Sequence, residues 1–400
     1  MMRFLRPRKQ YMPSTARSSV PPSRSLRPLL RIVLILAALH AYIGWRLLPA
    51  LASGAAGWSA GVAWLALSTL LMPMSIFSGM LTPDRRLADR LSGIGSLAMG
   101  LFSSLLVLTL LRDVALALLP AAMPAARAAS AALVAGTALL VTLVGLVNAR
   151  RVARVVEVEV AIDGLAPALD GFCIVQLSDI HVGPTIKAAY VTAIVARVNT
   201  LDADLVAITG DVVDGNVAQL ARHTAPLAAL RARHGSALVT GNHEYYSGAD
   251  AWVAEFRRIG LRVLMNQHVV LEHDGARLVL AGVTDYNGAH FGAAHRSDPQ
   301  GALAGAPAGI PRILLAHQPR SADAAAAAGF DLQLSGHTHG GQFWPWNLFV
   351  RFQQPYTAGL HRLHRLWVYT SRGTGYWGPP KRFGAPAEIT RIRLRAARAG

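Results

Sequence analysis

Two uncharged apolar stretches constrain this chain most, because each is long enough to cross a lipid bilayer as one helix. They lie between Arg90 and Arg112, with 21 residues, and between Arg127 and Arg150, with 22 residues. At about 1.5 Å per residue, either helix reaches across a hydrocarbon core roughly 30 Å thick. The whole chain is 52% hydrophobic and 15% charged, so we expect a membrane region joined to a folded polar region.

Two further candidate spans precede these stretches. The uncharged segment from Leu47 to Pro83 is longer than one helix needs, and it predicts a span over residues 58–80. The earliest candidate is the weakest, because only 14 residues separate its flanking arginines and His40 lies among them. The prediction is therefore a membrane region over residues 29–150, with spans at about 30–48, 58–80, 91–111 and 130–149.

The basic residues predict how these spans are oriented. Basic clusters lie in the N-terminal tail, at Arg85 to Arg90 and at Arg150 to Arg154, and such clusters stay on the cytoplasmic side of a membrane. All three face the cytoplasm only if the first segment also crosses. This gives four spans in the inner membrane and a cytoplasmic C-terminal region. A cleaved signal peptide is the alternative for the first segment, but its long basic lead and the spans behind it disfavour that interpretation.

Charge and cysteine content exclude several classes of function. The formal net charge is +17, but residues 1–151 hold 16 Arg and Lys against 3 Asp and Glu, whereas residues 152–400 hold 23 against 19. The excess therefore flanks the apolar spans and does not indicate nucleic-acid binding. Cys173 is the single cysteine, which excludes an internal disulfide framework and Cys-rich metal sites. Residues 1–28 are rich in Arg, Pro and Ser and are expected to form a disordered tail.

From residue 151 onward, short apolar runs alternate with stretches of helical composition. The runs are expected to be strands buried on both faces of a sheet, since several are rich in Val, Ile and Leu. They cover residues 172–177, 205–208, 237–239, 313–316 and 332–334. The alternation predicts an α/β domain over residues 151–400.

Each of the five runs is followed by residues that bind metals in other proteins. The motifs are Ser178-Asp179-Ile180-His181, Gly210-Asp211-Val212-Val213-Asp214, Gly241-Asn242-His243-Glu244, His317, and Gly336-His337-Thr338-His339-Gly340-Gly341-Gln342. Because the carboxyl ends of strands in α/β sheets converge on one crevice, we expect these side chains to meet. Burying so many carboxylates and imidazoles is costly unless a divalent ion accepts their lone pairs.

The donor set favours two ions rather than one. Seven candidate ligands exceed what one four-coordinate ion takes, and two ions that share a carboxylate would use them all, at a separation of roughly 3.5 to 4 Å. Nitrogen and oxygen donors without thiolate favour manganese, with iron or zinc as alternatives. Each motif alone also occurs as an ordinary turn or cap, so the prediction depends on their joint occurrence.

In this order, the five motifs resemble the calcineurin-like metallophosphoesterase superfamily over about residues 171–394. The resemblance implies two mixed sheets packed face to face, with helices outside. It implies one metal held by Asp179, His181 and His339, a second held by Asn242, His317 and His337, and a bridge formed by Asp211. His243 would lie beside the substrate phosphate as an electrostatic clamp or general acid, oriented by Asp214.

The chemistry implied is hydrolysis of a phosphoester. A hydroxide shared by two divalent ions is a nucleophile at neutral pH, because the metals lower the pKa of water from 15.7 toward about 7. The expected function is a membrane-anchored phosphohydrolase that cleaves a phosphodiester or pyrophosphate, with a lipid-linked molecule as the preferred substrate class. The alternatives are a phosphatase or phosphodiesterase for soluble nucleotides or phosphoproteins, and a membrane sensor without turnover.

Two C-terminal segments bear on the substrate. Thr370 to Gly375 is similar to a segment of the bacterial membrane-associated members of this superfamily, and Arg372 within it is a candidate for contacting phosphate, since guanidinium binds phosphate bidentately. A role of Arg372 in the fold alone is the alternative. The aromatic run Phe343 to Phe352 has the composition of a segment at a lipid interface, and packing within the domain is the alternative for it.

Overall fold

The computed structural model describes residues 27–118 and 124–397 of the chain. The predicted disordered tail therefore lies outside the described residues, apart from its last two positions, which begin the first helix. The membrane region contains α1 (Arg27–Leu51), α2 (Gly54–Leu71), α3 (Met74–Leu81), α4 (Arg85–Leu118) and α5 (Pro124–Arg150). Within the described part of the chain, α1, α2, α4 and α5 are long and apolar enough to cross a membrane. The expectation of four apolar membrane helices is confirmed.

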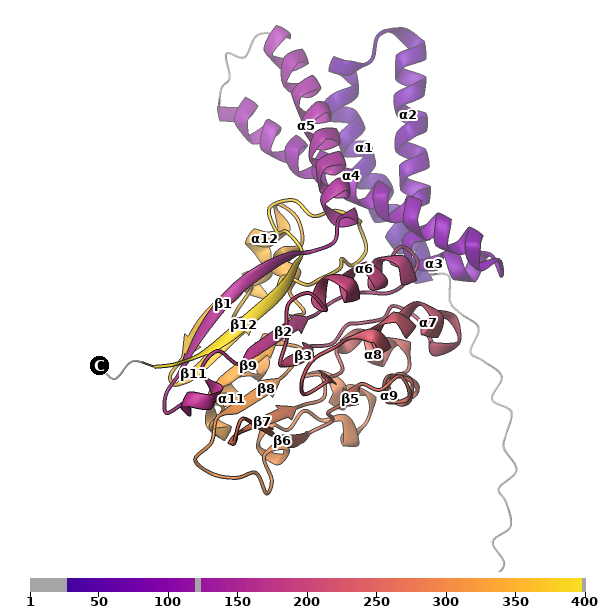
Figure 1. Ribbon diagram of the computed structural model, residues 1–400. Helices are drawn as coiled ribbons and strands as arrows, with labels where there is room; N and C mark the ends of the chain where they lie inside the picture. Colours follow the sequence, from indigo (N-terminus) through magenta and orange to yellow (C-terminus); the bar gives the residue numbers. More distant parts are fainter. Residues whose placement is uncertain (1–26, 119–123, 398–400) are drawn as a thin grey trace, which may run out of the picture.

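The helix boundaries differ from the predicted spans in two places. The range 58–80 is divided between α2 and α3, because Pro73 has no backbone N–H to continue the helix and its ring clashes with the preceding turn. Helix α4 has 34 residues, or about 51 Å of length, which exceeds a hydrocarbon core of roughly 30 Å. A span of this length tilts or extends beyond the core, and its first turns lie on the side of the C-terminal domain (Figure 1).

The C-terminal domain is built on two six-stranded mixed sheets, as the motif resemblance implied. The strand orders are β1-β12-β2-β3-β4-β5 and β10-β11-β9-β8-β7-β6. The first sheet contains β1 (Arg154–Ile162), β2 (Cys173–Leu177), β3 (Leu205–Ile208), β4 (Ser236–Leu238), β5 (Arg262–Val263) and β12 (Glu388–Ala396). The second contains β6 (Gln267–His273), β7 (Ala276–Gly282), β8 (Arg312–Leu315), β9 (Leu332–Ser335), β10 (Gly359–Leu363) and β11 (Leu366–Thr370). All five predicted runs form strands.

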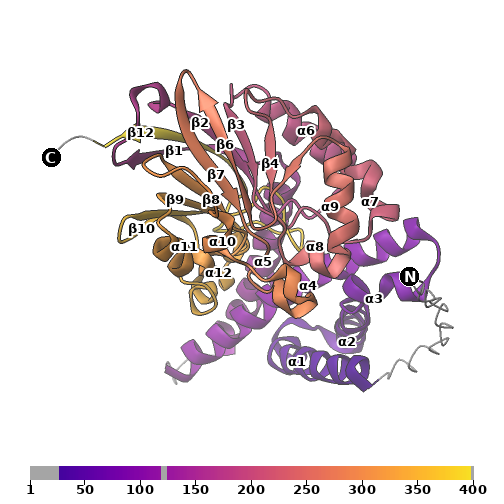
Figure 2. The same cartoon turned by 90° about the horizontal axis from the view of Figure 1, so that it is seen from below.

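Helices cover the outer faces of the two sheets (Figure 2). The first sheet carries α6 (Ala188–Val198), α7 (Val217–Thr224) and α9 (Ala249–Arg258), and the second carries α10 (Pro299–Ala302) and α11 (Ala322–Ala328). Two short helices, α8 (Asn242–Ser247) and α12 (Trp346–Phe349), follow strand-end motifs.

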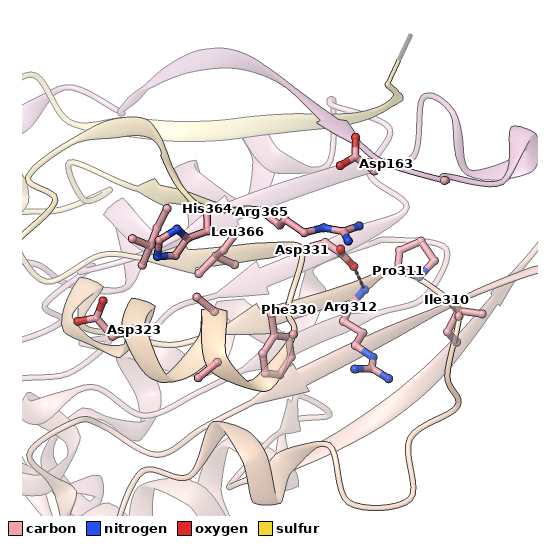
Figure 3. Close-up of a pocket in the computed structure, with 16 residues that line it drawn as sticks. Asp163, Ile310, Pro311, Arg312, Asp323, Phe330, Asp331, His364, Arg365 and Leu366 are labelled. Carbon is pink, nitrogen blue, oxygen red and sulfur yellow. Dashed lines mark hydrogen bonds between the residues drawn. The ribbon is translucent and has the colours of Figure 1, made fainter. Parts of the chain in front are cut away.

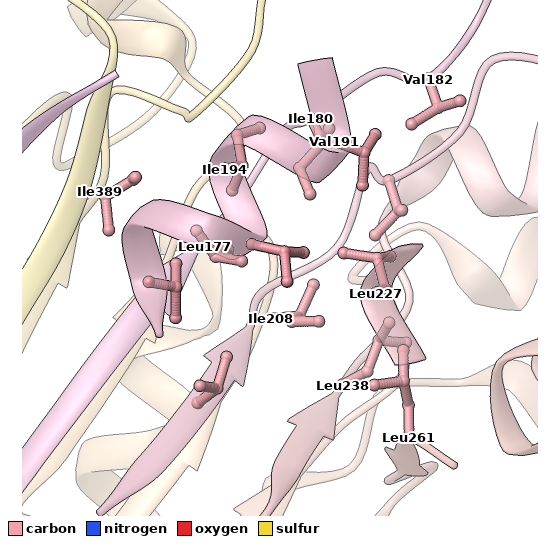
Figure 4. Packing of buried hydrophobic residues seen from close by; sticks show 14 of the residues in the cluster. Leu177, Ile180, Val182, Val191, Ile194, Ile208, Leu227, Leu238, Leu261 and Ile389 are labelled. Atoms are coloured by element: carbon pink, nitrogen blue, oxygen red, sulfur yellow. The ribbon is translucent and has the colours of Figure 1, made fainter. Parts of the chain in front are cut away.

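Alternating side chains on each central strand fill two separate cores. On β3, Val206 and Ile208 pack under the outer helices, whereas Leu205 and Ala207 face the other sheet, as the two-residue period of a strand requires. Figure 4 shows Ile208 in the outer core, with Val191 and Ile194 of α6 above it. Burial on both faces fixes the register of the central strands, and it thereby fixes where their polar ends lie.

Polar contacts dock the C-terminal domain onto the membrane helices. Lys381 is 1% exposed, and its Nζ donates to the carbonyl of Gly100 at 2.9 Å, to Ser104 Oγ at 2.5 Å and to Thr142 Oγ1 at 3.2 Å. These three residues belong to α4 and α5. On the same side of the domain, Trp346 Nε1 donates to Ser103 Oγ of α4 at 2.9 Å. A lysine of the domain thus lies between two membrane helices.

We predict that Lys381→Met loosens this docking. Methionine keeps most of the side-chain packing but removes the hydrogen bonds of the Lys381 ammonium group to α4 and α5, which costs about 1 to 3 kcal/mol. In detergent micelles, the variant should be cut faster by protease between α5 and β1, with unchanged secondary structure by circular dichroism. Arg258→Met is the control, because it removes the ion pair of an exposed arginine with Glu255 within α9 that contributes less than about 1 kcal/mol. Equal protection of Lys381→Met and wild type would contradict the docking role.

Candidate metal centre

The predicted ligands lie where the carboxyl ends of strands from both sheets meet. Asp179 and His181 follow β2, Asp211 follows β3, and Asn242 opens α8 just after β4. From the second sheet, His317 follows β8, whereas His337 and His339 follow β9. The two sheets therefore deliver their polar ends to one place, as the convergence argument predicted.

The His and Asp side chains form two clusters around Asp211. In the first, His181 Nε2 lies 3.0 Å from His339 Nε2, which lies 3.5 Å from Asp179 Oδ1. In the second, Asp211 Oδ2 lies 3.0 Å from His317 Nε2, which lies 3.2 Å from His337 Nδ1. Asp211 Oδ2 is also 4.0 Å from His181 Nε2, so its carboxylate lies between the two clusters.

The donor set fits divalent cations. The clusters place carboxylate oxygens and imidazole nitrogens close enough to share an ion, since in each group one ligand atom per residue lies within 4.8 Å of the others. Asn242 Oδ1 is buried and has no hydrogen-bond partner among the described residues. A buried carbonyl oxygen normally has a partner, and a cation beside it would supply one.

Neighbouring groups orient the imidazoles. His317 Nδ1 lies 2.8 Å from the carbonyl of Thr209, and His181 Nδ1 lies 2.9 Å from Asp214 Oδ1. Both acceptors suit a proton on Nδ1, and in that tautomer Nε2, on the side of Asp211, would be the atom that binds a cation. Partners of this kind set ring orientation and basicity in metal sites. Arg382, 1% exposed, donates to the carbonyl of His339 at 3.0 Å and holds that loop from behind.

The backbone around the clusters is strained. Five of the predicted ligands have positive φ angles, between 52° and 71°: Asp179, His181, Asp211, His337 and His339. Such a conformation costs a non-glycine residue about 1 to 2 kcal/mol, so it persists only where other contacts impose it. Gly336 shows how tightly the loops pack, because a Cβ there would lie 1.9 Å from Ser178 Oγ and 2.2 Å from Asp179 Oδ2.

Glu244 holds the backbone of the Asp211 loop in its strained conformation, a role that the sequence did not predict. Its side chain is fully buried and accepts from the backbone N–H groups of Asp211 at 2.9 Å, Val212 at 2.7 Å and Gly241 at 2.7 Å. Burial, reinforced by the charge of Asp211, raises the pKa of Glu244 to about 7, although these amides favour the carboxylate. An acidic residue at the third helical position was the signal for this cap.

The comparisons with known proteins agree with this geometry. A family model described as calcineurin-like phosphoesterase matches residues 173–341. A protein of Aquifex aeolicus described as an uncharacterized metallophosphoesterase is 33% identical over 224 residues, covering 56% of this chain and 84% of that protein. The chain belongs to the calcineurin-like metallophosphoesterase family. The C-terminal domain is its phosphoesterase domain.

Two vertebrate relatives combine this domain with a membrane region. Proteins of Bos taurus and Danio rerio, both described as "Transmembrane protein with metallophosphoesterase domain", are 41% identical over 270 residues and 38% identical over 272 residues. The matches cover 64% and 65% of this chain, and 61% and 62% of the two relatives. The chain thus spans less than two thirds of the length of these relatives.

His243 and Asp214 lie together at the edge of the phosphoesterase site. His243 Nδ1 is 2.7 Å from Asp214 Oδ1. Burial lowers the pKa of His243, but the charges of Asp211 and Asp214 outweigh it and raise that pKa to about 9. Burial raises the pKa of Asp214, but His181 and His243 bring it down to about 2. The apposed charges favour an imidazolium held by a carboxylate.

Arg372 and the aromatic run have contacts within the fold, but these contacts do not test their predicted roles in substrate binding. Arg372 Nη1 lies 2.8 Å from Glu388 Oε2, so it has a partner within the fold, and its contact with phosphate stays a prediction. In the aromatic run, Phe343 is buried, whereas Trp346, Phe349 and Phe352 are 48%, 52% and 73% exposed. The first aromatic residue therefore packs inside the domain, and the later ones form an exposed apolar face beside α4.

Of two cavities that border the domain, only one reaches the predicted catalytic residues. A cavity of about 740 Å³ is lined by Asp163, Arg312, Asp331 and Arg365; Figure 3 shows Asp331 accepting a hydrogen bond from the backbone of Arg312. It lies at the amino ends of β8 and β9, away from the strand ends that carry the predicted ligands. Another cavity, of about 500 Å³, reaches Asp214 and His243.

We predict that Glu244→Gln weakens the metal centre. The substitution sets an NH₂ group against buried backbone N–H groups, which costs about 1 to 3 kcal/mol of unfolding free energy and weakens metal binding roughly 10- to 100-fold. Thermal unfolding and metal content after dialysis measure the two effects. Glu272→Gln, an exposed change on β6, is the control. If Glu244→Gln retained metal as well as wild type does, the Glu244 carboxylate would not be needed to hold the Asp211 loop, and the prediction would be wrong.

Proposed function

We propose that the chain is a membrane-bound phosphoester hydrolase that works with two divalent metal ions. The supporting observation is the position of Asp211, whose Oδ2 lies 3.0 Å from His317 Nε2 in one cluster and 4.0 Å from His181 Nε2 in the other. A carboxylate between two groups of donors is the arrangement that a pair of ions about 4 Å apart requires.

The proposed ligands follow the two clusters. Asp179, His181 and His339 hold one ion, Asn242, His317 and His337 hold the other, and Asp211 is shared. We propose manganese, with iron or zinc as alternatives, because the donors are imidazoles and oxygens. When bound, the ions supply a water of lowered pKa as nucleophile and positive charge facing the phosphoryl oxygens.

His243 and Asp214 contribute the remaining charge. With its Nδ1 hydrogen bonded to Asp214, the imidazolium of His243 has Nε2–H free for a phosphoryl oxygen or for the leaving oxygen. Asp214 keeps this ring oriented and charged. One such pre-oriented donor contributes roughly 3 to 4 kcal/mol to stabilising the transition state.

The proposed substrate is a phosphodiester or pyrophosphate of a lipid-linked molecule in the inner membrane. The exposed aromatic residues Trp346, Phe349 and Phe352 support this class, because their rings contact one another in series and Trp346 is hydrogen bonded to α4. Arg351 lies over the ring of Phe352. Aromatic rings with a nearby cation are typical of a surface that contacts the lipid interface. A soluble nucleotide or phosphoprotein is the rival, and substrate comparison distinguishes the two.

We predict that Asp211→Asn lowers kcat/KM by several orders of magnitude and reduces metal content, whereas His243→Ala keeps its metal and loses about 10²- to 10³-fold in kcat. Both are measured on detergent-solubilised, manganese-loaded protein, with bis(p-nitrophenyl) phosphate as substrate and elemental analysis for metal. His364→Ala, at the remote cavity, is the matched control. Normal turnover and metal content in both site variants would mean that the roles are misassigned.

We also predict that the phosphoesterase domain faces the cytoplasm. The basic start of α4 and the basic end of α5 lie on the side of this domain (Figure 1), and clusters of basic residues stay inside. Alkaline phosphatase, which works only in the periplasm, should be inactive when fused after Gly400 and active when fused after Leu118. The opposite pattern would overturn the proposed orientation.

A further inference from the structure

The cavity at His243 has one wall made by the phosphoesterase domain and one made by membrane helices. The domain contributes Asp214, His243 and Trp377 to this space of about 500 Å³. Helices α3 and α4 contribute the opposite wall, lined by Ser75, Ile76, Gly79, Ser92, Ser96 and Met99. Residues far apart in the sequence thus enclose one space next to the predicted metal ligands.

Specific contacts hold both walls in place. Asp89 of α4 pairs with Lys187 of the domain at 2.7 Å, and Ser92 Oγ donates to the carbonyl of Ser75 at 2.9 Å, which joins α4 to α3. On the domain side, Gln342 bonds both the N–H and the carbonyl of Trp377, at 2.9 and 2.8 Å. The cavity is therefore a built feature of the docked chain.

The membrane-side wall has the chemistry of an amphiphile site. Ile76 is 72% exposed, and a Cβ on Gly79 would have no neighbour within 4 Å, so this face of α3 is uncovered where it borders the cavity. At its rim, Arg85 is exposed and pairs with no carboxylate among the described residues. His243 and Trp377, with ring centroids 5.6 Å apart, mark the other end. Apolar side chains and serine hydroxyls line this wall, the Arg85 cation lies at its rim, and the predicted catalytic residues lie at the other end of the cavity.

We propose that α3 and the first turns of α4 form part of the substrate site, and that they bind the alkyl chain of a phosphoester amphiphile from the adjacent leaflet. The chain lies against Ile76 and Gly79, Arg85 attracts the anionic head group, and the phosphoester reaches His243. This inference rests on the proposed phosphoesterase function and identifies the membrane helices as determinants of specificity. The bilayer is the proposed source because the helices next to this wall are apolar enough to span one.

Two substrates that differ only in chain length test the composite site. Ethyl p-nitrophenyl phosphate and hexadecyl p-nitrophenyl phosphate have the same leaving group, and the second is presented in mixed micelles to the full-length, manganese-loaded protein. Gly79→Trp places a bulky ring at the membrane-side wall of the cavity from an uncrowded position. We expect it to lower kcat/KM for the hexadecyl ester at least tenfold and to change that for the ethyl ester less than twofold.

Gly136→Trp is the matched control, because Gly136 lies on membrane helix α5 and is equally uncrowded; both esters should be cleaved as by wild type. Ile76→Gln, at an exposed position, is a second variant that should raise KM for the hexadecyl ester three- to tenfold. Equal effects on both esters, or none, would overturn the composite site while leaving the hydrolase standing. A wild-type protein inert toward both esters would reject the proposed function, and the composite site with it.

Discussion

The buried carboxylate of Glu244 is the constraint on which the rest of the metal centre depends. Its oxygens accept hydrogen bonds from backbone N–H groups after β3 and from that of Gly241 after β4. The loops that follow the two strands therefore share one acceptor. Asp211 can then hold its left-handed conformation and place its carboxylate between the two clusters. A strained backbone at a functional site requires such support from outside the site.

A second constraint joins the membrane helices to the same centre. Lys381 is bound between α4 and α5, and the next residue, Arg382, donates to the carbonyl of His339. Adjacent residues of one segment therefore set both the position of the domain on the helices and the position of a predicted ligand. The cavity shared by α3, α4 and His243 exists only because this docking brings the two parts together.

The sequence was most informative where structure is local. Runs of Val, Ile and Leu followed by Asp, Asn or His predicted both the strands and the convergence of their ends, since a strand fixes where its last residue lies. The length of α4 was underestimated, because the predicted span stops at the flanking charged residues, and charge alone does not end a helix.

The charge distribution has a further consequence once the parts are placed together. The first turns of α4 and the end of α5 are basic and lie on the side of the phosphoesterase domain. In the proposed orientation, they face the anionic surface of the cytoplasmic leaflet, where each basic residue contributes about 1 kcal/mol of attraction. The same residues would keep the spans oriented, hold the domain close to the leaflet and raise the local concentration of anionic phosphoesters near Arg85. The basic excess that first indicated membrane topology would thereby also favour access of the proposed anionic substrate to the predicted metal centre.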